Sequence, residues 1–172
     1  RRDREGLNPP SGVFFQNPDD RDVFLFRNLI RGDVPVVLLN GSGVDLNCYV
    51  TTPLPRIPRF LLGARLLVEK GVREYVGAAR VLKKRFPQAI FRVAGSIDAN
   101  PLSIAASELE AWQAEGVIDY LGELDDVRPA LTDTQVYVLP SYYREGQPRS
   151  ILEAMAMGRP IITTDAPGCR ET

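Results

Sequence analysis

Two acidic residues, Glu145 and Glu153, lie on either side of a run that leads into a predicted helix. The run is Gly146-Gln147-Pro148-Arg149-Ser150. Ser150 followed three residues later by Glu153 is a capping-box pattern, in which the hydroxyl and the carboxylate each accept an unpaired backbone amide. The pattern therefore predicts that Glu145 lies on a loop and that Glu153 lies in the first turn of a helix.

The predicted helix covers 151–157, with Gly158 as its stop signal and Pro160 just beyond. A loop of free amides that leads into a helix N-terminus attracts anions, because the unpaired N–H groups and the helix dipole both favour negative charge. A phosphate group suits this geometry.

Two cations, Arg65 and Lys70, occupy a second predicted loop, which follows an apolar strand candidate. A guanidinium can fork onto phosphate oxygens and a lysine adds a mobile point charge. Alternatively, both are solvated charges at a helix start, with Lys70 paired to Glu69 or Glu74.

Three features together resemble the donor-binding signature of retaining glycosyltransferases of family 4, the group 1 glycosyltransferases. They are the Glu-Gly-x-Pro-x-Ser sequence at 145–150, the spacing of Glu145 and Glu153, and Ala-Met-Gly-x-Pro-Ile at 156–161. The resemblance extends from about Arg59 to Thr172. It implies transfer of a sugar from a nucleotide-diphosphate sugar with retention at the anomeric carbon.

The resemblance also implies a role for each candidate residue. Arg65, Lys70 and the amides of Ser150 and Ile151 bind the diphosphate, the backbone at Leu124 faces the nucleobase, and Glu153 accepts hydrogen bonds from the ribose. Glu145 contacts the donor sugar, and Gly146, Gln147, Pro148 and Arg149 line the same pocket. The catalytic residues are then Glu145, Arg65 and Lys70.

Some of these residues also have a structural explanation. The capping box alone accounts for Glu153, although a carboxylate has enough lone pairs for both roles. Glu145 has a weaker alternative as an exposed loop acid, and Gly95 is read as an ordinary turn glycine. Trp112 falls on the apolar face of a predicted helix, which favours a core position over sugar stacking.

Apolar segments typical of strands and helices alternate from Arg59 onward, which predicts an α/β fold with a parallel sheet and helices on both faces. By resemblance this Rossmann-like fold is the C-terminal half of a GT-B fold, incomplete at both ends. Strand candidates are 60–64, 89–94, 117–121, 136–139 and 160–164, and helix candidates are 72–86, 102–115, 126–132 and 151–157.

The predicted organisation has three parts. Residues 59–172 form the donor-binding domain, truncated at its C-terminus, and 51–58 form a stiff linker with three prolines. Residues 1–50 are the tail of an N-terminal acceptor domain and its crossover, although a plain strand–turn connection also explains 36–45. Within them we expect strands at 13–15 and 36–39, the second one buried, and a helix from Asn17 to about Ile30.

Composition excludes several classes of function. The chain has 172 residues, 44% of them hydrophobic, and its formal net charge is −1 without a basic block, so nucleic acid is not an expected partner. It contains no histidine, which excludes histidine-based hydrolysis and zinc binding, and its two cysteines, Cys48 and Cys169, are widely spaced. We expect no metal or other cofactor and no transmembrane segment or signal peptide. We expect a cytoplasmic protein, whose contact with the membrane, where it occurs, is peripheral and at the inner face.

The resemblance thus implies the donor-binding part of a retaining glycosyltransferase, with a UDP-sugar as the donor. The acceptor, a glycan or a lipid-linked sugar in surface polysaccharide or lipopolysaccharide synthesis, binds mainly to the N-terminal domain. The alternatives are a nucleotide-sugar-binding module without transfer activity and a phosphorylase or epimerase of similar architecture. A dinucleotide-binding oxidoreductase requires Gly-x-Gly-x-x-Gly after the first strand of the sheet, and 63–68 do not match it.

Overall fold

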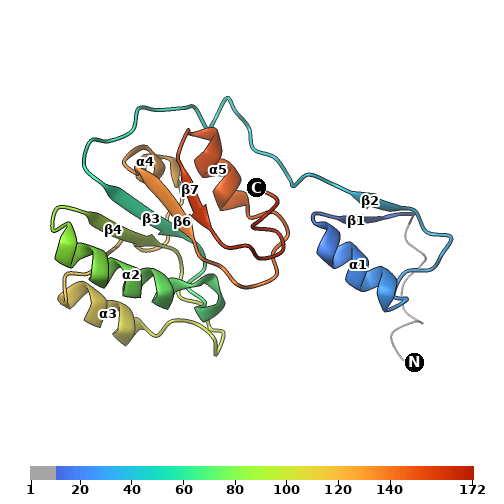
Figure 1. Ribbon diagram of the computed structural model, residues 1–172, viewed down its shortest axis with the longest axis horizontal. Helices are drawn as coiled ribbons and strands as arrows, with labels where there is room; N and C mark the ends of the chain where they lie inside the picture. Colours follow the sequence, from blue (N-terminus) through green and yellow to red (C-terminus); the bar gives the residue numbers. More distant parts are fainter. Residues whose placement is uncertain (1–10) are drawn as a thin grey trace.

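The computed structural model describes residues 11–172, which form a five-stranded α/β domain and a smaller βαβ unit (Figure 1). The small unit consists of β1 (Val13–Phe15), α1 (Pro18–Phe26) and β2 (Val36–Leu38). The strands of the large domain are β3 (Arg59–Gly63), β4 (Ile90–Ala94), β5 (Asp119–Tyr120), β6 (Val136–Leu139) and β7 (Ile161–Thr163). Its helices are η1 (Val68–Lys70), a single 3₁₀ turn, α2 (Val72–Arg85), α3 (Ala106–Ala114), α4 (Arg128–Thr132) and α5 (Arg149–Ala156).

The five strands of the large sheet are parallel, in the order β5-β4-β3-β6-β7. The chain starts in the middle at β3, moves outward to β5, and returns to place β6 on the other side of β3. The loops that follow β3 and β6 therefore diverge, and this switch point is where open α/β sheets bind ligands. The predicted Rossmann-like parallel sheet is confirmed.

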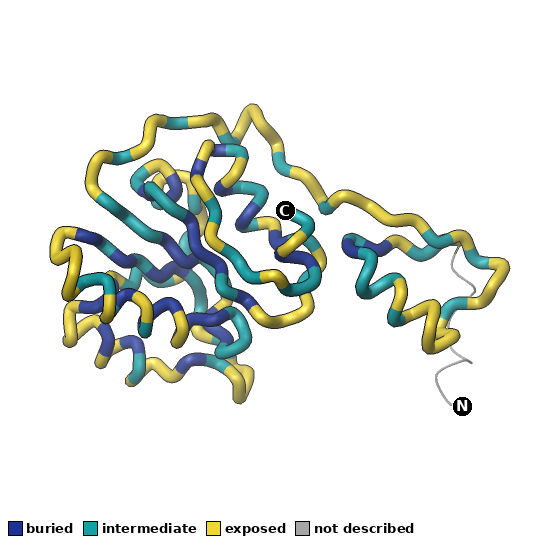
Figure 2. Tube along the Cα trace, in the orientation of Figure 1, coloured by how far each residue is buried: buried dark blue, intermediate teal, exposed yellow. Residues whose placement is uncertain are grey.

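Both faces of this sheet are covered by helices, as predicted. Neighbouring residues of β3 point to opposite faces because side chains alternate along a strand. Leu62 belongs to the core under α2 and α3, whereas Leu61 belongs to the core under α4 and α5. Figure 2 shows the buried residues concentrated along the central strands and the inner sides of these helices.

Helix α2 follows directly from its apolar spacing. Val72, Val76 and Ala79 recur on one helical face and are fully buried. Basic residues at 83–85 close its last turn, where they interact favourably with the negative end of the helix dipole. The helix ends before Pro87, whose ring disfavours helical backbone at the preceding residue.

Helix α4 begins at Arg128 rather than Asp126, and α1 and α3 differ more from the prediction. Helix α3 begins at Ala106 rather than near Leu102, because the Leu102 carbonyl accepts a hydrogen bond from Val68 and Ser103 forms an antiparallel bridge with Leu67. Helix α1 ends at Phe26 rather than near Ile30, and Asn28 adopts a left-handed backbone with φ of 51° that ends regular helix.

The small βαβ unit packs loosely. Its two parallel strands are covered by α1, and Phe15 packs edge-to-face against Phe24 with ring centroids 5.2 Å apart. The other side of the pair is open, so Phe14 is 63% exposed. The prediction of a buried strand at 36–39 is therefore wrong: β2 covers Val36–Leu38, where Val36 is partly buried and Val37 and Leu38 are about 40% exposed.

Residues 51–58 form no helix or strand and run along the edge of the large domain. The Thr52 amide donates to the Met157 carbonyl. The buried guanidinium of Arg159 donates to the carbonyls of Thr52, Thr134 and Met157, and burial lowers its pKa. Division of the chain into an acceptor-domain tail, a linker and a donor domain stays a prediction.

Candidate functional site

The candidate site lies at the carboxyl ends of β3 and β6, where two loops meet. The loop after β3 passes through η1 to Gly71, which has φ of 75°. A Cβ atom at Gly71 would lie 2.2 Å from the carbonyl oxygen of Pro140, so only glycine allows this close approach to the loop after β6. The Glu69 carbonyl joins the loops by accepting a hydrogen bond from the Tyr142 amide at 3.0 Å.

Lys70 and Glu145 form an ion pair across these two loops. Their side chains are only 13% and 14% exposed. The Ser141 hydroxyl donates a second hydrogen bond to the Glu145 carboxylate at 2.9 Å, and the Lys70 ammonium lies 5.7 Å from the centre of the Tyr143 ring. The alternative in which Lys70 pairs with Glu69 or Glu74 is therefore wrong. Glu145 is not an exposed loop acid either.

Helix α5 begins two residues earlier than predicted and has no capping box. Pro148 occupies the N-cap position and Arg149 is the first helical residue, so Ser150 already lies inside the helix. Its hydroxyl makes no cap, and the predicted capping role of Ser150 and Glu153 is wrong. The sequence pattern misled because the fixed φ of proline starts the helix without a side-chain acceptor.

The first amides of α5 differ in what they bind. The Ile151 amide donates to the Pro148 carbonyl at 3.0 Å. In the described part of the chain, the amides of Arg149 and Ser150 donate to no protein acceptor. Of the two amides predicted to bind a diphosphate, Ser150 is the one left available.

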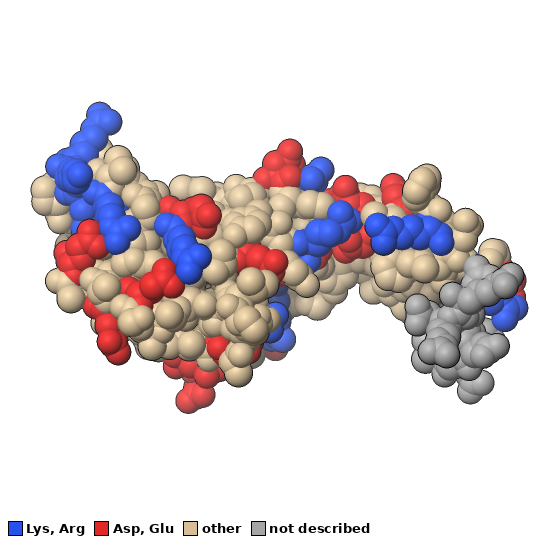
Figure 3. All heavy atoms as spheres, turned by 90° about the horizontal axis from the view of Figure 1, so that it is seen from below, with Lys and Arg blue, Asp and Glu red and all other residues tan. Residues whose placement is uncertain are grey.

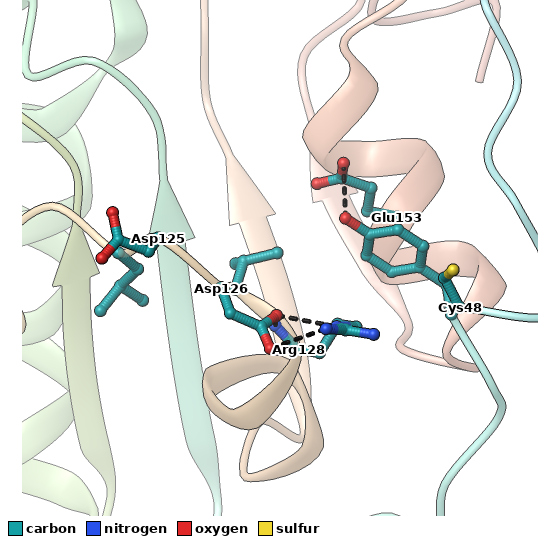
Figure 4. A pocket seen from close by; sticks show the side chains of 8 residues that line it. Cys48, Asp125, Asp126, Arg128 and Glu153 are labelled. Carbon is teal, nitrogen blue, oxygen red and sulfur yellow. Dashed lines mark hydrogen bonds and ion pairs between the residues drawn. The ribbon is translucent and has the colours of Figure 1, made fainter.

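Without a cap to make, the Glu153 carboxylate faces a cavity beside the sheet. It accepts hydrogen bonds from the Tyr49 hydroxyl and from Nε of Arg149, both at 2.9 Å. Burial, and then the hydrogen bond to Glu153, raise the pKa of the Tyr49 hydroxyl. Figure 4 shows Glu153 and the tyrosine ring joined across this cavity, with Arg128 paired to Asp126 nearby.

Two adjoining cavities accompany these residues and share Leu124 and Val127. One has a volume of about 480 Å³, and its lining residues are Cys48, Tyr49, Leu124, Asp125, Asp126, Val127, Arg128 and Glu153. The other has a volume of about 230 Å³, and its lining residues are Gly63, Ala64, Arg65, Ala94, Gly95, Ser96, Glu123, Leu124, Val127, Tyr137 and Ser150.

Arg65 and Ser150 thus line the same cavity although they are 85 positions apart. The Arg65 side chain is 62% exposed, and its ion-pair partner among the described residues, Asp98, is 3.5 Å away. That distance exceeds an ordinary charge-assisted hydrogen bond, so the guanidinium is available to a ligand. Arg65 from the β3 loop and Ser150 at the α5 N-terminus therefore meet at one edge of the sheet.

The other predicted sugar-pocket residues are held in place by the protein itself. The Gln147 amide donates to Oε1 of Gln16 at 3.0 Å, and its side chain donates to the Glu171 carbonyl at 2.8 Å. Pro148 is buried, and the Arg149 side chain turns toward Glu153. Their predicted contacts with a donor sugar stay predictions.

Some residues of the site were not found from the sequence. Tyr49 and Cys48 line the larger cavity, and their one signal was their place just after the Asn-Gly-x-Gly-Val-Asp run. Tyr137 is fully buried below the site and its hydroxyl donates to the Gly63 carbonyl at 2.6 Å, with a pKa raised by burial. Trp112 belongs to the core, as predicted.

Charge over the molecule is mixed. On the face shown in Figure 3 acidic and basic side chains are interspersed, apart from a basic group at the end where α2 terminates. Among residues 11–172 no three histidine, cysteine or acidic side chains converge on a point that could hold a metal ion. No helix in that range has the length and apolar character needed to span a bilayer.

Comparison with known proteins gives a consistent result. The family model described as "Glycosyl transferases group 1" matches residues 57–172. The N,N′-diacetylbacillosaminyl-diphospho-undecaprenol alpha-1,3-N-acetylgalactosaminyltransferase of Campylobacter jejuni is 40% identical over 114 residues, which are 66% of this chain and 28% of that protein. WcaL of Escherichia coli (strain K12), provisionally named as a colanic acid biosynthesis glycosyltransferase, is 30% identical over 139 residues, 74% of this chain and 34% of that protein. The chain therefore spans about a third of the length of these curated relatives.

Solved structures share the fold at low sequence identity. HepE of Anabaena in complex with UDP superposes with a TM-score of 0.75 at 21% identity, covering 94% of this chain and 46% of that one. The pneumococcal O-GlcNAc transferase GtfA in complex with UDP and GlcNAc gives a TM-score of 0.67 at 22% identity, covering 91% and 30%. Both matches reach beyond the five-stranded domain and include most of the described chain.

Proposed function

Because this chain belongs to the group 1 glycosyltransferases, we propose that it binds a nucleotide-diphosphate sugar at the switch point of its five-stranded sheet and presents that sugar for transfer. The observation that carries the proposal is that Arg65 and Ser150 line one cavity at the carboxyl ends of β3 and β6, while Glu153 lines the adjoining cavity. The Lys70–Glu145 pair joins the two loops that follow these strands.

The diphosphate lies between the β3 loop and the start of α5. Arg65 supplies a forked donor, Lys70 a point charge, and the Ser150 amide a donor at the positive end of the helix. Together these groups oppose the negative charge of the diphosphate, and the proposal therefore needs no metal ion. The amide of Ile151 joins them only if it leaves the Pro148 carbonyl.

The nucleoside lies in the two adjoining cavities. In the free chain Glu153 accepts a hydrogen bond from the Tyr49 hydroxyl. In the complex the ribose hydroxyls replace Tyr49 as donors to Glu153. The base lies against the backbone at Leu124, which lines both cavities. UDP is the proposed nucleotide, supported by the UDP complexes of HepE and GtfA, which share the fold.

The donor sugar lies next to Glu145. In the free chain Lys70 and Glu145 neutralise one another, so the donor separates them: the diphosphate takes the ammonium and the sugar hydroxyls take the carboxylate. The Lys70 ammonium is then paired with the diphosphate, and the Glu145 carboxylate with the sugar hydroxyls. The donor thus replaces one ion pair with two charge-assisted contacts.

The transfer proposed retains the configuration at the anomeric carbon. The bond between the anomeric carbon and the diphosphate oxygen breaks, and the acceptor hydroxyl forms its new bond on the same face of the sugar. The departing diphosphate takes the proton of that hydroxyl. Arg65, Lys70 and the α5 N-terminus lower the barrier because they are already oriented toward the charge that grows on the leaving group.

The acceptor proposed is a glycan or a lipid-linked sugar, bound mainly by a partner domain, in the synthesis of surface polysaccharide. The names of the Campylobacter and Escherichia relatives, which refer to an undecaprenol-linked sugar and to colanic acid, support this class. We place the protein in the cytoplasm, in peripheral contact with the inner face of the membrane where such acceptors lie.

Calorimetry of the chain with UDP and with UDP-hexoses tests the proposal. Arg65→Ala should weaken UDP binding by about 1.5–3 kcal/mol, roughly 10- to 150-fold, because one charge-assisted bond is lost. Arg80→Ala is a matched control, since Arg80 pairs with Glu115 on the helical layer and lines neither cavity. Absence of UDP binding by the wild-type chain, or equal binding by both variants, would contradict the proposal.

A further inference from the structure

We propose that Gln16 and Asn17, in the turn between β1 and α1, are positioning residues for the loop that carries Glu145. They belong to the small βαβ unit, whereas the loop belongs to the five-stranded domain. The inference rests on the proposed function, because it assigns to these residues the alignment of the sugar-binding carboxylate.

The two side chains hydrogen-bond the backbone of the loop on either side of Gly146. Nδ2 of Asn17 donates to the Glu145 carbonyl at 2.8 Å across 128 positions of sequence. Oε1 of Gln16 accepts from the Gln147 amide at 3.0 Å. One carbonyl and one amide of the same short loop are thus both satisfied from the other unit.

Asn17 is the side chain that can fill both roles at this place. It is fully buried, and its Oδ1 caps α1 by accepting from the Asp20 amide at 2.7 Å. Serine, threonine or aspartate would cap the helix equally well. Asparagine alone among the preferred capping residues also carries an amide group with two donors, which it gives to the Asp20 carboxylate and to the Glu145 carbonyl.

The opposite side of the loop is fixed by the large domain. The Glu145 amide donates to the Pro167 carbonyl at 3.2 Å. A Cβ atom at Gly168, which has φ of 87°, would lie 1.8 Å from the carbonyl oxygen of Gly146, so the two backbones touch. The loop is therefore held between Gly168 on one side and the β1–α1 turn on the other.

Arg65 and Glu153 do not depend on this arrangement. They reach their cavities from the β3 loop and from the body of α5, and neither hydrogen-bonds the small unit through residues 11–38. Loss of the Gln16 and Asn17 contacts should then displace the Glu145 carboxylate from the sugar, and any loosening of its pair with Lys70 leaves that ammonium freer for the diphosphate. The signature is a fall in UDP-hexose affinity relative to UDP affinity, without a loss of UDP affinity.

Three variants of the full chain separate this role from a structural one. Gln16→Ala removes the acceptor, Gln16→Glu keeps an oxygen at the same reach, and Asn17→Ser keeps the cap but loses the donor to Glu145. We expect Gln16→Ala and Asn17→Ser to lower the ratio of UDP-hexose affinity to UDP affinity about fivefold, the loss of one hydrogen bond, without lowering UDP affinity itself. Gln16→Glu should bind both ligands as the wild type does.

The outcomes are distinguishable by calorimetry together with thermal unfolding. Equal weakening for UDP and UDP-hexose, accompanied by a lower melting temperature, would show a structural role and overturn the inference. An unchanged ratio of UDP-hexose affinity to UDP affinity in Gln16→Ala would also overturn it, and that variant carries the test if Asn17→Ser does not fold. A wild-type chain that binds neither ligand would instead overturn the proposed function, and this inference with it.

Discussion

Replacement of Glu145 by glutamine should raise the affinity for UDP and lower the relative affinity for a UDP-sugar. In the free chain the Glu145 carboxylate holds the Lys70 ammonium, and the diphosphate must compete with it. Glutamine removes the charge but keeps an oxygen that the Ser141 hydroxyl can donate to. Lys70 is then free to meet the diphosphate, whereas the sugar loses a charged acceptor.

The magnitude follows from the burial of the pair. Exposed ion pairs contribute about 0.2–1 kcal/mol, whereas breaking a fully buried pair costs about 3–5 kcal/mol. With side chains 13% and 14% exposed, this pair lies between these limits, so we expect a stability loss of about 1–3 kcal/mol. Release of about 1 kcal/mol of this competition corresponds to a UDP affinity about fivefold higher.

Calorimetry with UDP and with a UDP-hexose, together with urea unfolding, measures both effects. The ratio of UDP-hexose affinity to UDP affinity should fall about tenfold, since the sugar loses a hydrogen bond to a charged group. Glu115→Gln is the matched control: it breaks the exposed pair with Arg80 and should leave both affinities unchanged. A UDP affinity that stays constant or falls in Glu145→Gln would refute the competition between carboxylate and diphosphate.

Glu153→Gln should leave stability near that of the wild type, because the amide oxygen still accepts from Tyr49, but should weaken UDP binding by about 1 kcal/mol, the difference between a charged and a neutral acceptor. Calorimetry with 2′,3′-dideoxy-UDP, which lacks the ribose hydroxyls, should show no difference between Glu153→Gln and wild type, and a persisting difference would contradict the ribose role. Gly71→Ala should lower the melting temperature, since the left-handed backbone costs about 1–3 kcal/mol and the new Cβ meets the Pro140 carbonyl. Gly77→Ala, where a Cβ has no neighbour within 4 Å, should instead stabilise α2 by about 0.5–1 kcal/mol, and thermal unfolding that ranks the two variants the other way would contradict this account.

Much of the fold could be predicted because its signals are local. Alternating apolar segments from Arg59 onward identify the strands and helices, and repeated βα units require a parallel sheet. The start of α5 was mispredicted because Ser150 and Glu153 match a capping pattern that Pro148 makes unnecessary. The burial of β2 was mispredicted because apolar character does not report whether a second layer covers the strand.

The site was predictable only in its short-range parts. Spacing along the chain suggests phosphate-binding groups at Arg65 and Ser150, and the sheet order brings them to one cavity. No local pattern could show that Tyr49 donates to Glu153 or that Asn17 donates to the Glu145 carbonyl, because these partners are more than 100 positions apart. Such contacts depend on how segments distant in the sequence pack together in three dimensions. No short stretch of a single sequence shows that packing.

The buried guanidinium of Arg159 fixes where the chain can bend. Arg159 donates to the Thr52 carbonyl, and the Thr52 amide donates to the Met157 carbonyl. These bonds attach residues 51–58 to the large domain. A hinge between the two units must therefore lie upstream, within 39–50, where no helix or strand stiffens the backbone. Tyr49 lies inside that stretch, so any rotation there would also move the Tyr49 hydroxyl, which donates a hydrogen bond to Glu153.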